Sequence, residues 1–336
     1  MALCKLCGEK EADRKNTHYL TDAIIRSCLN HDGSNTRETG MMFDISNNKN
    51  AIQARFQRNT STAVVEKTFG REPTEQEIEQ AKIIPFSVDY VFCTGCEKIF
   101  TKIEEDFTNQ ILPKLRGHDF KGTEELSFTE HIIIRKFFLL QVYRTSVCDP
   151  GFIISDQFQE QLRELIYKPD ADIAKLTAIP LNVTYLNTVG DDFEYTKNTV
   201  GIASFNDNQI VIFNDFIIQA FETMQDVRYV DFLGFNDPKT FDYFTNINED
   251  VFKFKVIDNE TRIKLWSAYS NEKADDERRF YRREFINAYL DCYGKFPPVP
   301  LIEAFVNEII YGESVSDESR YSIERITKIK QQMLSA

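Results

Sequence analysis

Apolar residues in the middle of the chain follow a helical period. They predict a helix from Leu126 to Arg144, with a capping box of Ser127 and Glu130 at its start. From Ile132 to Val142 apolar residues occupy almost every side, which predicts that the helix is buried. A second helix is predicted from 156 to 167, ahead of a proline. Amphipathic spacing also predicts helices over 21–29 and 97–115 in the N-terminal part.

After residue 180 the spacing changes to that of strands. Apolar and β-branched residues predict strands over 181–186, 199–205, 209–213 and 252–257. Helical spacing returns near the C-terminus, where the predicted helices are 275–292, 299–311 and 318–334. Helices and strands are grouped along the chain, so the pattern predicts an α+β fold with a helical middle, a mixed sheet and a helical C-terminal tail.

Two Cys-x-x-Cys pairs, Cys4/Cys7 and Cys93/Cys96, carry the most specific chemical signal in the sequence. Such a turn presents two thiolates at the right spacing for one tetrahedral ion, so the two pairs together predict a structural zinc site. Unrelated thiols or a single redox pair are the alternatives. A redox pair is disfavoured because no βαβ pattern surrounds either motif.

A metal site of this kind would hold together the two ends of a long insertion. The chain therefore divides into three predicted segments. They are a zinc module with its insertion over 1–120, a helical segment packed on it over 121–178, and an α+β C-terminal domain over 179–336.

The composition is that of a folded protein, because 42% of the 336 residues are hydrophobic and 13% are aromatic. This excludes a disordered chain. No run of about 18 apolar residues occurs, and the N-terminus lacks the pattern of a secretory signal. We therefore expect a cytoplasmic protein with reduced cysteines and no membrane contact.

The net charge of −13 is unevenly distributed along the chain. Residues 1–120 hold 16 basic and 18 acidic side chains, whereas the remainder holds 24 and 35. An acidic body does not attract nucleic acid by itself, because affinity depends largely on clustered cations. Any nucleic-acid contact would have to be local or supplied by a more basic partner.

The order of the motifs resembles that of zinc-containing HNH (ββα-metal) nucleases. A first knuckle, the turn that carries Cys4 and Cys7, is followed by a strand centred on Thr17-His18 and a long insertion. A second knuckle, which carries Cys93 and Cys96, then leads into the helix from Glu97. More narrowly, the second Cys-x-x-Cys pair with its flanks, Phe92 to Glu97, and the helical segment from Arg135 to Ser146 are similar to a branch of uncharacterised bacterial HNH-like proteins. The resemblance covers roughly the first 170 residues.

This resemblance implies that His18 is the general base and that a catalytic Mg²⁺ or Mn²⁺ stabilises the phosphate and the leaving oxygen. Two positions depart from the family pattern: Thr17 replaces an acidic ligand, and Glu97 stands where a histidine ligand is expected. Glu97, with Glu104 or Glu105 along the same helix, is a candidate ligand for that ion. The plainer interpretation is a packing histidine and a glutamate that favours the helix dipole.

A basic stripe is predicted on one face of a C-terminal helix. It could contact phosphates or an acidic partner, or it could be a solvated face paired with neighbouring acidic residues. Its members are Arg278, Arg279, Arg282 and Arg283.

The resemblance favours an intracellular metal-dependent nuclease effector. Because HNH-like modules commonly occur in bacterial anti-phage defence systems, such defence is the expected context. The alternative is a zinc module that has lost catalysis and binds a protein or nucleoprotein partner. The substitutions at Thr17 and Glu97 and the acidic charge support this alternative. In either case the C-terminal half would sense a signal, form a homo-oligomer or dock a partner.

Overall fold

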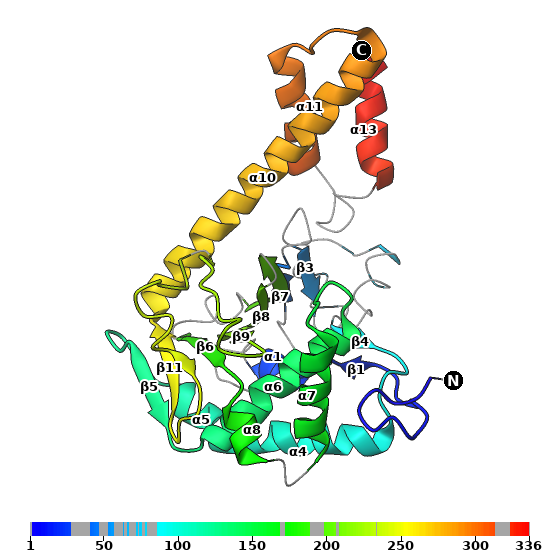
Figure 1. Ribbon diagram of the computed structural model, residues 1–336. Coiled ribbons are helices and arrows are strands. Elements are labelled where there is room, and N and C mark those ends of the chain that lie inside the picture. The colour runs from blue at the N-terminus through cyan, green and yellow to red at the C-terminus, as the bar shows by residue number, and fades with distance from the viewer. Residues whose placement is uncertain are drawn as a thin grey trace.

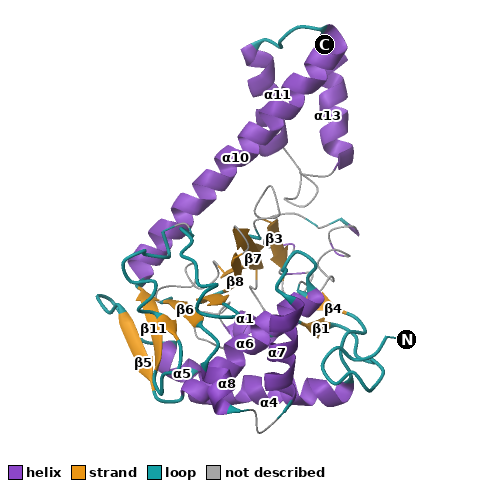
Figure 2. Cartoon of the chain, in the orientation of Figure 1, coloured by secondary structure: helices purple, strands orange, loops and turns teal. Residues whose placement is uncertain are grey.

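A computed structural model describes residues 2–27, 41–46, 53–56, 86–168, 172–188, 198–205, 208–232, 234–312 and 323–335, together with single positions between 63 and 78. Figure 1 shows a body of helices and strands from which a long helical arm extends. The strands lie within the body, whereas the described elements of the arm are all helices joined by loops (Figure 2). No described helix is both long and apolar enough to cross a membrane.

The elements follow one another in three groups. The first is β1 (Thr17–His18), α1 (Asp22–Ser27), β2 (Met41–Asp44), β3 (Gln53–Phe56), β4 (Ser87–Val88), α4 (Thr94–Gln110) and α5 (Leu112–Leu115). The second is β5 (Glu125–Phe128), α6 (His131–Cys148), α7 (Asp156–Tyr167), α8 (Ile173–Thr177), β6 (Leu181–Leu186), β7 (Asn198–Phe205), β8 (Asn208–Phe213), β9 (Phe216–Ala220), β10 (Thr245–Asn246) and β11 (Phe252–Ile257). The third is α10 (Asn259–Tyr293), α11 (Val299–Tyr311) and α13 (Ile323–Ser335). The predicted α+β class with a helical C-terminal tail is confirmed.

Nine of the described strands form one mixed sheet in the order β3-β2-β7-β8-β9-β6-β11-β5, with β10 beside β6. The β2–β7 and β6–β11 pairs are parallel, and the other pairs are antiparallel. The sheet takes strands from all three predicted segments, since β2 and β3 come from the first, β5 from the second and the others from the third. One hydrophobic core likewise runs from Cys4 to Val256. The three segments therefore share one sheet and one core.

Both faces of the central strands are buried. In β8, Val211 and Phe213 face the core formed with α6, whereas Ile210 and Ile212 face a second core. That second core includes Trp266 of α10. Because neighbouring residues of a strand point to opposite faces, a strand covered on both sides is apolar at nearly every position. This explains why β8 and β9 read as continuous apolar runs.

The predicted start of the long central helix is wrong. Residues 125–128 form β5, which pairs with β11, and α6 begins only at His131. Glu130 is the N-cap residue, but no side chain caps the helix there. The hydroxyl of Ser127 donates instead to Glu125 Oε1 at 2.7 Å, so the predicted capping box does not form. The strand depends on a partner far along the chain, which local spacing cannot reveal.

The arm is built on α10, whose 35 residues span about 52 Å at 1.5 Å per residue. Its first turns pack on the sheet through Trp266 and Tyr269. Residues 270–276 are almost all exposed, as expected of a helix that bridges two cores through solvent. Beyond them, α10, α11 and α13 share a separate core in which the rings of Phe285 and Phe305 stack at 4.6 Å.

Candidate metal centre

The first cysteine pair lies in a tight turn at the N-terminus. The Cys4 amide donates to the Lys10 carbonyl at 2.7 Å, and the Gly8 amide donates to the Cys4 carbonyl at 2.8 Å. Gly8 has a φ of 70°, in the left-handed region that glycine enters without steric penalty. The amide of Lys5 also donates to the carbonyl of Val91 at 3.0 Å. This bond fixes the first knuckle against the segment that leads into the second.

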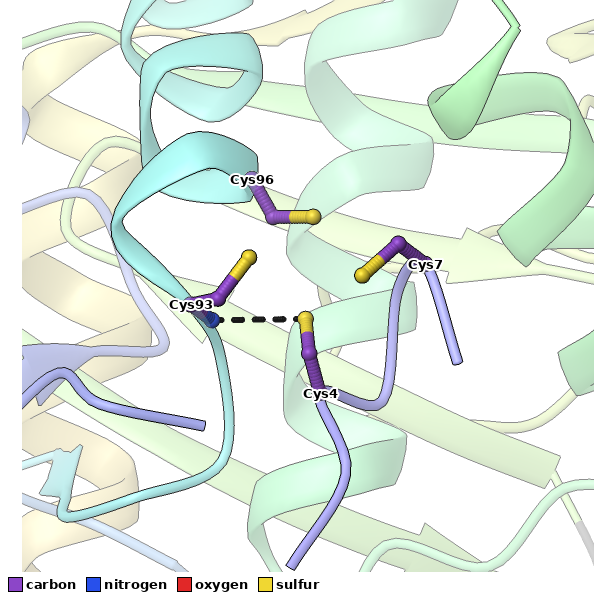
Figure 3. A group of neighbouring side chains, drawn as sticks. All are labelled: Cys4, Cys7, Cys93 and Cys96. Atoms are coloured by element: carbon purple, nitrogen blue, oxygen red, sulfur yellow. Dashed lines mark hydrogen bonds between the residues drawn. The ribbon is translucent and has the colours of Figure 1, made fainter. Parts of the chain in front are cut away.

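The second pair lies at the start of α4. Cys93 is the N-cap residue and Cys96 lies in the first turn, where the helix dipole favours negative charge. The amide of Cys93 donates to the Cys4 sulfur at 3.3 Å, so the two knuckles also contact each other directly. Figure 3 shows the four side chains converging from these two segments.

The four predicted cysteines come together as one cluster. The sulfur atoms of Cys4, Cys7, Cys93 and Cys96 all lie within 4.8 Å of one another. None of them is in a disulfide, Cys7 is half-buried and the other three are buried. The cluster can hold a metal ion. Within the described part of the chain, no other three or more His, Cys, Asp and Glu side chains converge in this way.

The electrostatics of the sulfurs differ from one to the next. Burial raises the pKa of Cys4 and of Cys96. Burial also acts on Cys7, but backbone hydrogen bonds from Lys10 and Glu9 lower its pKa to about 7. Buried thiolates are unfavourable without a compensating positive charge. A metal cation would supply that charge to all four sulfurs, so the donor set fits such an ion.

The residues around His18 have the ββα order. β1 pairs antiparallel with β4, with Thr17 opposite Val88 and His18 opposite Ser87, and α4 follows. His18 is half-buried, and its Nε2 lies 3.9 Å from the Asp22 carboxylate. The structure thus places His18 on the short strand β1, paired with β4, which precedes α4 in the chain.

Glu97 lies in the first turn of α4, next to Cys96, and is half-buried. Burial raises the pKa of its carboxyl group, and Glu104 raises it further, while the guanidinium of Arg144 lowers it. The hydroxyl of Thr17 is also close enough to lower this pKa. Thr17 and Glu97, the two positions that depart from the family pattern, are therefore neighbours in space.

An arginine from α6 neutralises the acidic side of α4. Arg144 Nη1 lies 2.5 Å from Glu104 Oε1, and the Arg144 side chain is only 4% exposed. Its guanidinium stacks over the Phe100 ring at 5.2 Å. Glu104 also accepts a hydrogen bond from the Thr21 hydroxyl at 2.7 Å, and that hydroxyl contacts Gln141 at 3.1 Å. The Glu104 carboxylate is thus occupied by internal partners.

Sequence reasoning identified Glu97 and Glu104 but missed Arg144. The available signal was an arginine inside an otherwise apolar helix, because a buried guanidinium requires an acidic or carbonyl partner. Arg135 in the same helix has a carbonyl partner, since its Nη1 donates to the Ile179 carbonyl at 2.9 Å. The identity of the partner could not be read from the sequence, because α4 and α6 meet only in the folded chain.

The basic stripe lies on the exposed arm. Three of its arginines contact acidic side chains: Arg278 with Asp275, Arg279 with Asp276 and Arg282 with Glu303. Arg278 also donates to the hydroxyl of Tyr311. These contacts agree with a solvated face paired with acidic neighbours, and they leave the stripe less charge for an external phosphate.

No family model, no curated protein and no solved structure matches the chain significantly. The resemblance to HNH nucleases therefore stays a prediction from the order of the motifs. The function has to be inferred from the geometry of the cysteine cluster, the acidic residues of α4 and the arm.

Proposed function

We propose that this protein is a zinc-stabilised binding protein whose HNH-like module does not hydrolyse phosphodiesters. The observation that carries the proposal is the ion pair between Arg144 and Glu104 at 2.5 Å. It puts a permanent internal cation on the acidic face where a catalytic ion would have to be held.

Zinc is the metal that the cysteine cluster suits best. Tetrahedral zinc binds thiolates at about 2.3 Å, which separates the sulfurs by roughly 3.8 Å. The sulfur atoms lie within 4.8 Å of one another, so small side-chain adjustments suffice. Four protein ligands also leave no open position for water or substrate, which is typical of structural sites. The zinc would join the N-terminal turn to α4 and thereby organise β1, β4 and α4 around it.

The environment of the acidic residues argues against a second, catalytic ion. Magnesium and manganese bind through several carboxylate or other oxygen ligands around one position. Here Glu104 is engaged by Arg144 and Thr21, and Thr17 offers only a hydroxyl beside Glu97. A divalent ion at Glu97 would also lie close to the positive charge of Arg144, and like charges repel. These contacts favour the binding protein over the hydrolase.

The arm supports a binding role. Beyond Tyr269, α10 runs through solvent and carries a separate small core at its far end, so this part of the arm adds surface without adding to the core of the body. Its form is that of an interaction element.

A cleavage assay tests the proposal. Purified zinc-loaded protein is incubated with plasmid DNA and with RNA in Mg²⁺, Mn²⁺ or Ni²⁺, beside His18→Ala. We expect no cleavage by either protein. Metal-dependent cleavage by the wild type that disappears in His18→Ala would overturn the proposal.

A metal-dependent nuclease is the second candidate function. It is favoured by the ββα order of β1, β4 and α4 and by the position of His18 on β1. In that case His18 would accept the proton of the attacking water. The same assay separates the two functions.

A further inference from the structure

The four cysteines of the cluster differ in their access to solvent. Cys4, Cys93 and Cys96 are only 1%, 3% and 3% exposed, whereas Cys7 is half-buried. The turn that follows Cys7 is open as well, because residues 8–11 are all exposed. A small dissolved oxidant can therefore approach the cluster at Cys7, whereas burial protects the other three sulfurs.

A second thiol lies next to Cys7. Cys4 is three residues away in the same knuckle, and its sulfur lies within 4.8 Å of the Cys7 sulfur (Figure 3). Neither cysteine is in a disulfide, so both can still be oxidised. Cysteines that respond to oxidants are typically accessible to solvent and have another thiol close by, which converts the first oxidation product into a disulfide. Cys7 and Cys4 meet both conditions.

The first knuckle is also attached to the body by contacts that do not involve its sulfurs. The Tyr143 hydroxyl of α6 donates to the Lys5 carbonyl at 2.8 Å, and Arg163 Nη1 of α7 donates to the Leu6 carbonyl at 2.7 Å. Leu6 itself is fully buried in the main core. These contacts would keep the first knuckle in place after the loss of an ion, so that the loss can be reversed.

We propose that the cysteine cluster is a peroxide-sensitive zinc centre, in which Cys7 is oxidised first and Cys4 completes a disulfide that releases the ion. The Cys7 thiolate attacks one oxygen of hydrogen peroxide and becomes a sulfenic acid, while the other oxygen leaves as hydroxide. The Cys4 thiolate then attacks the Cys7 sulfur, forms the disulfide and expels a second hydroxide. Two electrons thus pass from the two sulfurs to the peroxide, and the two hydroxides take up protons from the solvent.

The disulfide leaves only the two thiolates of the second knuckle for the ion. A closed structural zinc site has four protein ligands, so a centre with two of them loses the ion. Oxidation would remove the link that the ion provides between the first knuckle and α4, while the hydrogen bonds of this knuckle to α6 and α7 remain. The inference rests on the zinc centre of the proposed function and adds its regulation by oxidation.

Zinc release under hydrogen peroxide tests the inference. Full-length protein is first shown to hold about one zinc ion per chain and is then treated with peroxide, while a chelating dye reports the free zinc. We expect about one zinc ion to be released per disulfide formed, and peptide mapping of the alkylated protein should place that disulfide between Cys4 and Cys7. A dithiol reductant with added zinc should restore the metal content, and circular dichroism should show that the fold persists throughout.

Cys7→His is the most informative variant, because three cysteines and one histidine also form a closed zinc site. The variant lacks the accessible sulfur, so its zinc release should be at least about tenfold slower than that of the wild type. The control is Cys292→Ser, which removes an exposed cysteine of α10 outside the cluster and should release zinc at the wild-type rate.

Three results would overturn the inference. They are zinc that stays bound while Cys292 becomes fully oxidised, a disulfide that does not include Cys7, and wild-type release from zinc-loaded Cys7→His. If Cys7→His binds no zinc, the disulfide mapped in the wild type decides. A wild type that holds no zinc before oxidation would refute the zinc centre of the proposed function as well, so the two failures are distinguishable.

Discussion

Replacing Arg144 by methionine removes the internal cation beside Glu104 while it keeps most of the side-chain volume. The Arg144 side chain is 4% exposed, and its Nη1 lies 2.5 Å from Glu104 Oε1. Removing one partner of a fully buried pair costs about 3–5 kcal/mol. The Glu104 side chain is 23% exposed and keeps its hydrogen bond from Thr21. We therefore expect a smaller loss in the free energy of unfolding, of about 2–3 kcal/mol.

Urea unfolding of zinc-loaded protein at pH 7 measures this loss. The control is Lys102→Met, because Lys102 forms an exposed pair with Asp106 on the same helix α4 and should lose less than about 0.5 kcal/mol. The double variant Arg144→Met/Glu104→Leu completes a thermodynamic cycle, which should give a coupling of at least about 1.5 kcal/mol. A loss below about 1 kcal/mol, or no coupling, would refute the view that Arg144 neutralises Glu104.

Three further predictions concern the cysteine cluster, Glu97 and the core of the arm. Cys93→Ser removes one of four converging sulfurs and should lower the free energy of unfolding by at least about 3 kcal/mol. The control Cys292→Ser changes an exposed cysteine and should alter this free energy by less than about 0.5 kcal/mol. Equal effects of the two variants in a urea titration would be evidence against a metal centre. Burial raises the pKa of Glu97, so its ionised form destabilises the fold, and this penalty grows as the pH rises from about 4.3 through the raised pKa. The stability of Glu97→Gln relative to the wild type should therefore increase as the pH rises from 4 to 8; a relative stability that stays constant or falls over this range would contradict this. Phe285→Ala removes a ring stacked in the core of the arm and should lower the free energy of unfolding of the arm by about 3–5 kcal/mol. Amide hydrogen exchange should become faster in the arm alone. Faster exchange throughout the body would show that the two cores are not independent.

Elements that depend on local spacing were predicted well. Helix α7 has the predicted bounds, and its N-cap Ser155 accepts a hydrogen bond from the Phe158 amide. Helix α11 and strands β6 and β11 also have the predicted bounds. Their periodicity and end signals lie within a few residues of each element, so the sequence contains the information that determines them.

Elements that depend on distant pairing were not predicted. The pairing of β5 with β11 takes up the predicted first residues of the central helix, and β2 joins the sheet beside β7, far along the chain. Strand β9 was also missed, although it follows β8 after a two-residue turn in which Asn214 has a φ of 55°. Its residues are buried on both faces, so they do not alternate between apolar and polar.

The same distinction holds for the candidate site. The cysteine cluster was predicted because a metal site imposes a fixed spacing within each pair, and this spacing survives in the sequence. The role of Arg144 was not predicted, because it depends on how α6 packs against α4. The long α10 was predicted only from residue 275 onward, because the exposed residues 270–274 carry no apolar periodicity that would join this part to the first turns.

The most direct test of the account is the metal content of the purified protein after equilibration with excess Mn²⁺ and removal of free ions, measured by mass spectrometry. We expect about one zinc ion per chain, held by the four cysteines, and no retained manganese. One retained manganese ion per chain beside the zinc, lost in Glu97→Gln, would contradict it and restore the nuclease as the first candidate.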